Sequence, residues 1–134
     1  MTIFVCLDDR NGMLFNRRRQ SRDAAVLEDI RASVTGRLLA DAYSEKLLRE
    51  AGIPWEPAPV ELPVTPGDGF FAEIRPSEEL AAAADTLVIY RWNRHYPADV
   101  RWDTDLAAAG FSLAETAEFP GRSHEKITKE VYTK

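Results

Sequence analysis

The sequence has 134 residues, of which 45% are hydrophobic and 29% charged, so we predict a single globular domain over residues 1–134. Its formal net charge of −5 argues against general DNA or RNA binding, because such binding rests largely on positive charge. No basic leader precedes the first apolar run, no run is long enough to cross a membrane, and the single cysteine, Cys6, has no disulfide partner. We therefore expect a cytoplasmic protein of bacterial type with no membrane partner, in which Cys6 is a small buried side chain.

The first elements are a buried strand, a loop and a helix. Residues 3–7 are apolar on both faces, which is typical of a parallel strand covered by helices. A loop over residues 12–23 follows and carries four arginines. Ser21 is the expected N-cap of a helix that runs to about Val34, with Gly36 just after its end.

The rest of the chain alternates short strands and helices. Residues 53–68 hold five of the eight prolines, and we interpret them as an extended surface connection. The other expected elements are a strand at 37–40, a helix from Ser44 to 51, a strand at 69–74, a helix after Ser77, a strand at 86–92, and two extended segments at 111–119 and 126–133. This order predicts an α/β fold, with a mostly parallel central sheet flanked by helices and closed by a C-terminal antiparallel hairpin.

Right-handed crossovers would place the strands at 3–7, 69–74 and 86–92 side by side. Ligands bind at the carboxyl ends of such strands, and arginines there indicate an anionic small molecule or a nucleotide. The expected ligand-binding residues are Asn11, Met13, Asn16, Arg17, Arg18, Arg19, Tyr43, Arg91, Asn93 and His95.

His124 and Glu125 form a second candidate, an acid/base pair next to Lys126, as in metal-independent ribonucleases. Neighbouring residues of a strand point to opposite faces, so the two cooperate only if the turn rotates them together. A plain hairpin turn is the alternative. With two histidines in the chain and no dense cluster, we expect no metal site.

The order of elements resembles that of the dihydrofolate reductases. In that family the first strand leads to a loop with a Gly-Met step, here Gly12-Met13, and then to a carboxylate that opens the first long helix, here Asp23. The closing region, with Asp99, Trp102 and Tyr132, is similar too. The resemblance implies a dihydrofolate reductase-like fold and a role for Asp23 as a catalytic acid.

The nicotinamide-binding motifs of that family are missing from this chain. Its glycine-containing segments are replaced by residues 40–44 and 73–76, where Asp41 and Glu73 would oppose a pyrophosphate. NADPH is compatible with the fold but its motifs are absent, so the cofactor is left open and folate reductase activity is not expected.

Residues 90–99 and 123–128 also resemble short bacterial proteins that are sometimes labelled ribonuclease Z. That enzyme binds two zinc ions through a dense histidine-aspartate motif, which this chain lacks. The label therefore implies no zinc chemistry here.

Three functions are compatible with these patterns. The first is a small-molecule or nucleotide-binding protein on a dihydrofolate reductase-like scaffold, without folate reductase activity. The second is a metal-independent ribonuclease or another small hydrolase. The third is a protein-interaction or regulatory module that uses the acidic surface to bind a protein partner.

Overall fold

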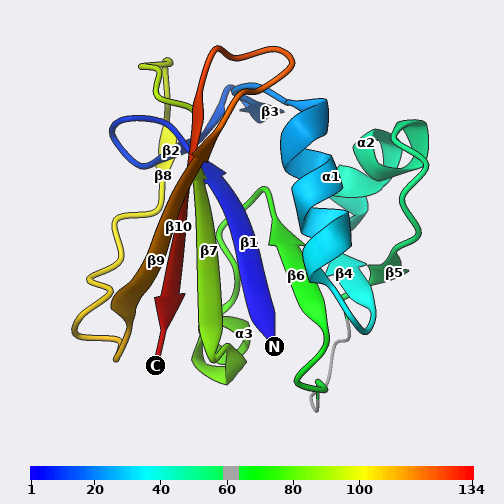
Figure 1. Cartoon of the computed structure of the whole chain (residues 1–134), viewed down its shortest axis with the longest axis vertical. Coiled ribbons are helices and arrows are strands. Elements are labelled where there is room, and N and C mark those ends of the chain that lie inside the picture. The colour runs from blue at the N-terminus through cyan, green and yellow to red at the C-terminus, as the bar shows by residue number, and fades with distance from the viewer. Residues whose placement is uncertain (59–63) are drawn as a thin grey trace.

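A computed structural model describes residues 1–58 and 64–134, and Figure 1 shows its central twisted sheet. The seven strands of this sheet lie in the order β5-β4-β6-β1-β7-β10-β9, and three short strands form a second sheet in the order β3-β2-β8. The strands are β1 (Thr2–Leu7), β2 (Gly12–Phe15), β3 (Arg18–Arg19), β4 (Leu38–Ala40), β5 (Glu56–Pro57), β6 (Gly69–Ala72), β7 (Thr86–Arg91), β8 (Val100–Arg101), β9 (Ser112–Phe119) and β10 (Ile127–Thr133). The helices are α1 (Ala24–Ser33), the 3-10 turn η1 (Ala42–Ser44), α2 (Glu45–Glu50) and α3 (Glu78–Ala83).

The predicted α/β architecture is confirmed. Strands β6 and β7 pair in parallel with the two sides of β1, and β10 pairs antiparallel with both β7 and β9. The C-terminal hairpin therefore closes a mostly parallel sheet, as expected. Part of the proline-rich connection at 53–68, residues 59–63, lies outside the described residues.

Both faces of the sheet carry apolar cores, because the residues of β1 alternate between them. Phe4 packs with α1 and α2 on one face, in a cluster with Ile30 and Leu48. Ile3 and Val5 pack on the opposite face, in a cluster that includes Trp102 at its edge. Burial on both sides explains the unbroken apolar run that marks this strand in the sequence.

Helix α1 begins later than predicted. Its N-cap is Asp23, whose carboxylate accepts a hydrogen bond from the Ala25 amide at 2.9 Å, and not Ser21. The Ser21 hydroxyl instead lies 3.0 Å from the ring of His124, a partner more than 100 residues away that local capping rules do not detect. At the other end the helix stops at Ser33, before Gly36.

The arginine-bearing segment after β1 is a small hairpin, where a loop was expected. Asn16 and Arg17 form its two-residue turn, with φ angles of 52° and 61°. Two consecutive positive φ angles are typical of a type I′ turn, which matches the twist of the paired strands β2 and β3. The strands were missed because they are only four and two residues long.

No helix in the described part of the chain is both long and apolar enough to span a lipid bilayer.

Candidate functional site

The carboxyl ends of β6, β1 and β7 lie side by side, as the topology argument predicted. A small cavity of about 20 Å³ opens there, between these strands and the start of α1. Its lining comprises Cys6, Met13, Arg19, Gln20, Ser21, Arg22, Asp23, Val26, Leu27, Leu47, Phe71, Ala72, Glu73 and Trp92. Space of this size holds about one water molecule. The cavity therefore has an apolar floor and a polar rim, but it is closed to larger molecules in this conformation.

Asp23 is a fully enclosed carboxylate at one wall of the cavity, with 1% of its surface exposed. One of its oxygens accepts hydrogen bonds from the backbone amides of Ala25 and Arg122, at 2.9 and 3.0 Å. The other accepts from the amides of Ser123 and His124 and from His124 Nδ1, at 2.9, 3.1 and 3.0 Å. Five donors thus converge on two oxygens and join the start of α1 to the turn between β9 and β10.

These donors keep Asp23 ionised. Burial alone would raise the pKa of its carboxyl group, but the hydrogen bonds from Arg122, His124, Ser123 and Ala25 together lower it to about 2. A carboxylate can only accept hydrogen bonds, so the His124 Nδ1 that faces it carries a proton, and in the neutral tautomer this arrangement leaves a lone pair at Nε2.

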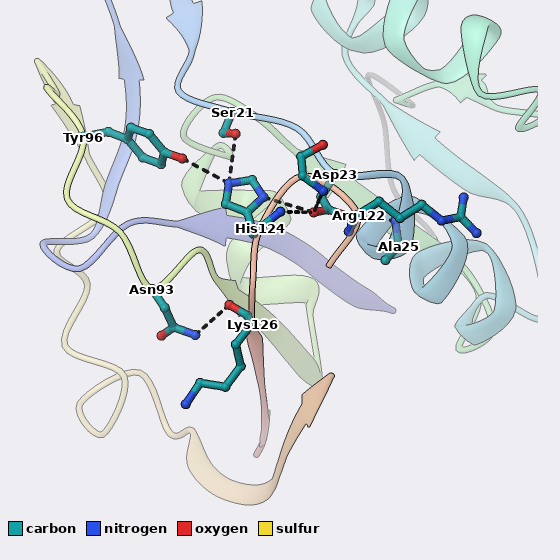
Figure 2. A network of polar contacts seen from close by, with 9 residues as sticks. Ser21, Asp23, Ala25, Asn93, Tyr96, Arg122, His124 and Lys126 are labelled. Carbon is teal, nitrogen blue, oxygen red and sulfur yellow. Dashed lines mark hydrogen bonds and ion pairs between the residues drawn. The ribbon is translucent and has the colours of Figure 1, made fainter. Parts of the chain in front are cut away.

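Two hydroxyl groups meet this lone pair, as Figure 2 shows. Ser21 Oγ lies 3.0 Å and Tyr96 Oη 3.1 Å from His124 Nε2. The imidazole, 5% exposed, is stacked on Trp92 with ring centroids 4.5 Å apart, which fixes its plane. Asp23 and His124, both predicted as catalytic residues, are therefore in direct contact.

Ser21 and Tyr96 were not predicted as site residues. Ser21 was assigned to helix capping, and its partner His124 is 103 positions further along the chain. Neither residue belongs to a motif, so only the tertiary structure reveals their shared contact.

An ion pair closes the rim of the cavity. Arg19 donates to both oxygens of the Glu73 carboxylate, at 2.6 and 2.9 Å, and its guanidinium lies 5.1 Å above the ring of Tyr43. The Glu73 side chain is 9% exposed and that of Arg19 27%. Of the predicted ligand-binding residues, Arg19 thus lines this edge and Tyr43 packs against its guanidinium, but the charge of Arg19 is already matched by Glu73.

Gln20, beside this pair, holds a polar atom without a partner. Its amide nitrogen donates to Asp8 Oδ2 at 3.0 Å and to the backbone oxygen of Pro97 at 3.3 Å, which uses both of its N–H groups. Its side-chain oxygen, although buried, has no hydrogen-bond partner among the described residues. A buried acceptor in this state costs free energy that a bound donor would recover.

Four of the other predicted ligand-binding residues belong to the β2–β3 hairpin, and one of the four lines the cavity. Met13 lines it, and Arg17 and Arg18 point outward from the β2–β3 hairpin as exposed side chains. Asn16 shares the turn of this hairpin with Arg17. Of the three predicted arginines in this hairpin, Arg19 therefore lines the cavity, whereas Arg17 and Arg18 lie outside its lining.

Asn11, Arg91 and His95 lie apart from the cavity lining. Arg91 donates to Asn11 Oδ1 at 2.6 Å and is also paired with Glu130, so it supports the turn after β1. His95 is an exposed residue of the loop that follows β7.

Glu125 faces an open surface cleft of about 890 Å³, which Asn93 and Lys126 also line. Asn93 donates to the backbone oxygen of Lys126 at 3.1 Å (Figure 2). His124 is buried and turned to Asp23, whereas Glu125 is exposed, so the structure does not bring these two neighbours together as a pair.

Within residues 1–58 and 64–134, no group of three or more histidine, cysteine, aspartate or glutamate side chains is placed to hold a metal ion.

Of the two acidic residues at the expected nicotinamide-binding positions, Asp41 follows β4 and burial raises its pKa. Glu73 follows β6, and its carboxylate forms an ion pair with Arg19.

Comparisons with known proteins identify the fold family that this structure resembles. No family model matches the chain, and no curated protein matches it. Among solved structures, the dihydrofolate reductase from Enterococcus faecalis complexed with NADP(H) and RAB-propyl is similar, with a TM-score of 0.66 and 12% sequence identity. The match covers 98% of this chain and 94% of that one. The chain therefore has a dihydrofolate reductase-like fold, while neither sequence comparison supports the resemblance to proteins labelled ribonuclease Z.

Proposed function

We propose that this chain is a small-molecule-binding protein on a dihydrofolate reductase-like scaffold, and that its ligand is anionic, with a nucleotide as the favoured class. The ligand binds over the mouth of the cavity where β1, β6 and α1 meet, once the Arg19–Glu73 ion pair at its rim has separated. The observation that carries the proposal is the unpartnered Gln20 side-chain oxygen in the wall of this cavity. Such an atom favours a ligand with an N–H donor, which nucleobases and related heterocycles provide.

The ion pair at the rim supports an anionic ligand. When Arg19 and Glu73 separate, the guanidinium is free to form a bidentate pair with a phosphate or carboxylate. The Glu73 carboxylate is then free to accept from N–H groups on the same ligand. The exposed Arg17 and Arg18 on the adjoining hairpin add positive charge on the outer side.

Folate reduction does not fit this arrangement. The carboxylate expected to act on a pterin ring, that of Asp23, is already surrounded by five donors from the protein. Binding a ring through this group would first require the 122–124 turn to be displaced, at a cost of several buried hydrogen bonds.

A thermal-shift screen of nucleotides, folates and phosphosugars tests the proposal. A ligand that binds the folded state raises the melting temperature in proportion to the logarithm of its excess over the Kd. We expect a nucleotide to do so, and the double variant Arg17→Ala/Arg18→Ala to weaken its binding. The matched control is Arg31→Ala, which removes an exposed arginine from the last turn of α1. No shift with any compound, or equal losses in both variants, would contradict the proposal.

A reductase assay completes the test. Purified protein with NADPH and dihydrofolate is expected to show no oxidation of NADPH above background. Sustained turnover would overturn the statement that the chain lacks folate reductase activity.

A further inference from the structure

Three side chains, two of which line the cavity, are joined in a line of hydrogen bonds. Asp23 Oδ2 accepts from His124 Nδ1 at 3.0 Å, and His124 Nε2 lies 3.0 Å from Ser21 Oγ (Figure 2). An ionised aspartate, a histidine whose tautomer it fixes, and a serine hydroxyl at the other ring nitrogen have the relative positions of a nucleophilic triad. Such a triad is recognised by geometry and roles, whatever the order of its members in the chain.

The proton positions support this interpretation. Because the Asp23 carboxylate holds the ring proton at Nδ1, the ring offers a single lone pair at Nε2. Two hydroxyl groups, those of Ser21 and Tyr96, lie within 3.1 Å of it, and only one of them can donate to it at a time. When Ser21 donates, the Tyr96 hydroxyl proton is free for another acceptor.

The position of Ser21 suits a nucleophile better than a buried structural group. Ser21 is half-buried and belongs to the cavity lining, so the carbonyl carbon of a substrate can approach its hydroxyl oxygen. His124 and Asp23, by contrast, are 5% and 1% exposed. The imidazole is held on one face by stacking on Trp92 and at Nδ1 by the Asp23 carboxylate, which together fix its plane and orientation.

We propose that Ser21 is the nucleophile of a hydrolytic site that cleaves short-chain acyl esters or thioesters, with His124 as general base, Asp23 as its orienting carboxylate and Tyr96 as oxyanion donor. The acyl class follows from the serine nucleophile, and the short chain follows from the cavity, whose volume of about 20 Å³ fits a methyl-sized group beside Ser21. The acyl group uses the cavity of the proposed binding function but does not require its anionic ligand.

The reaction balances without a metal or a redox partner. Ser21 Oγ forms a bond to the carbonyl carbon while its proton moves to His124 Nε2, and the carbonyl oxygen becomes an oxyanion that accepts from Tyr96. The tetrahedral intermediate collapses as the bond to the leaving group breaks, and His124 gives its proton to the departing alcohol or thiol. Water then attacks the acyl-serine, loses a proton to His124, and releases the carboxylic acid as Ser21 Oγ recovers its proton.

Covalent labelling tests the nucleophile directly. The full-length protein is incubated with methanesulfonyl fluoride, a serine-reactive probe whose organic group is methyl-sized, then digested, and the modified residue is located by mass spectrometry. We expect modification at Ser21, and its loss in Ser21→Ala. Ser33→Ala is the matched control, because Ser33 is exposed at the end of α1 and donates to the backbone oxygen of Asp29. No modification at Ser21, or equal modification of Ser33, would overturn the proposal.

Ester hydrolysis tests the substrate class. We expect cleavage of p-nitrophenyl acetate but not of the octanoate, with at least a tenfold lower rate in Ser21→Ala, where His124 is retained. Tyr96→Phe should lower kcat by about 100-fold at an unchanged fold, as removal of an oxyanion donor does. If both variants hydrolyse the acetate at the wild-type rate, the four residues have only a structural role.

The two proposals fail separately. Labelling at Ser21 without any nucleotide-induced thermal shift would retain the hydrolytic site and reject the anionic ligand. A nucleotide shift without labelling or hydrolysis would retain the binding function and reject the nucleophile.

Discussion

Replacing Asp23 with asparagine tests how the start of α1 is joined to the C-terminal turn. The amide keeps one oxygen, which can still accept from the Ala25 and Arg122 amides. Its NH₂ group then faces the amides of Ser123 and His124, which are donors and lose their acceptor. The His124 ring can adapt by moving its proton to Nε2.

The expected cost follows from these contacts. A buried N–H group without an acceptor costs about 1–3 kcal/mol, and the part-buried Ser123 amide costs less than the buried His124 amide. We therefore expect the free energy of unfolding to fall by about 3 kcal/mol at neutral pH. For a chain of this length that lowers the melting temperature by about 10 °C. Linkage gives a similar figure, because a carboxyl whose pKa is about 2 when folded and about 3.9 when unfolded contributes about 2.5 kcal/mol.

The sign of the pH dependence is fixed by the lowered pKa of Asp23. A group whose pKa falls on folding stabilises the protein fully above its unfolded pKa, and this contribution is lost as the pH drops from about 4 to about 2. The difference in stability between wild type and Asp23→Asn is therefore expected to shrink over that range.

Urea unfolding followed by tryptophan fluorescence measures both effects. The matched control is Asp9→Asn, because Asp9 is an exposed residue next to the buried Asp8, and its change should stay within about 0.5 kcal/mol. A loss below about 1 kcal/mol in Asp23→Asn, or a difference that does not vary with pH, would refute the reasoning.

Three other measurements probe neighbouring features. Gly121→Ala would place a Cβ 2.5 Å from Asp23 Oδ2 and 2.7 Å from the His124 backbone oxygen, so urea unfolding should show a loss of about 2 kcal/mol or more; an unchanged midpoint would mean that the turn yields freely. Cys6, expected to be buried, is half-buried in the cavity lining, where desolvation raises the pKa of its thiol. A disulfide reagent at mildly alkaline pH should therefore react with it much more slowly in the native than in the denatured protein, and equal rates would contradict the raised pKa. Glu73→Gln removes the carboxylate that pairs with the Arg19 guanidinium, so calorimetry should show tighter binding of inorganic phosphate than in wild type. Equal or weaker binding would contradict an anion site at the rim.

The fold could be predicted because its signals are local. The apolar run of β1 marks a strand buried on both faces, and Ser77 marks the start of α3, where its side chain accepts from the Leu80 amide at 3.2 Å. The positions of β6 and β7 on either side of β1 could be predicted from the handedness of parallel crossovers. The β2–β3 hairpin was missed because its strands are short and its turn contains Arg17 where glycine is usual.

The site was predicted only in part, because its contacts join distant segments. Asp23 and His124 were selected for separate reasons, one from a family resemblance and one as the partner of Glu125. Their hydrogen bond spans 101 positions of the chain, and no local pattern encodes it. Ser21 was assigned to the helix N-cap because a serine before a helix usually caps it. Its actual partner, His124, lies too far along the chain for a local rule to detect.

A titration followed by ¹⁵N NMR tests the central claim, that the cavity between β1, β6 and α1 is the ligand site. Uniformly labelled protein is titrated with a nucleoside monophosphate, and amide shifts are mapped along the chain. We predict that the largest shifts fall on residues 19–23 and 71–73. Shifts confined to the open cleft near Asn93 and Lys126, or none at saturating ligand, would contradict the account.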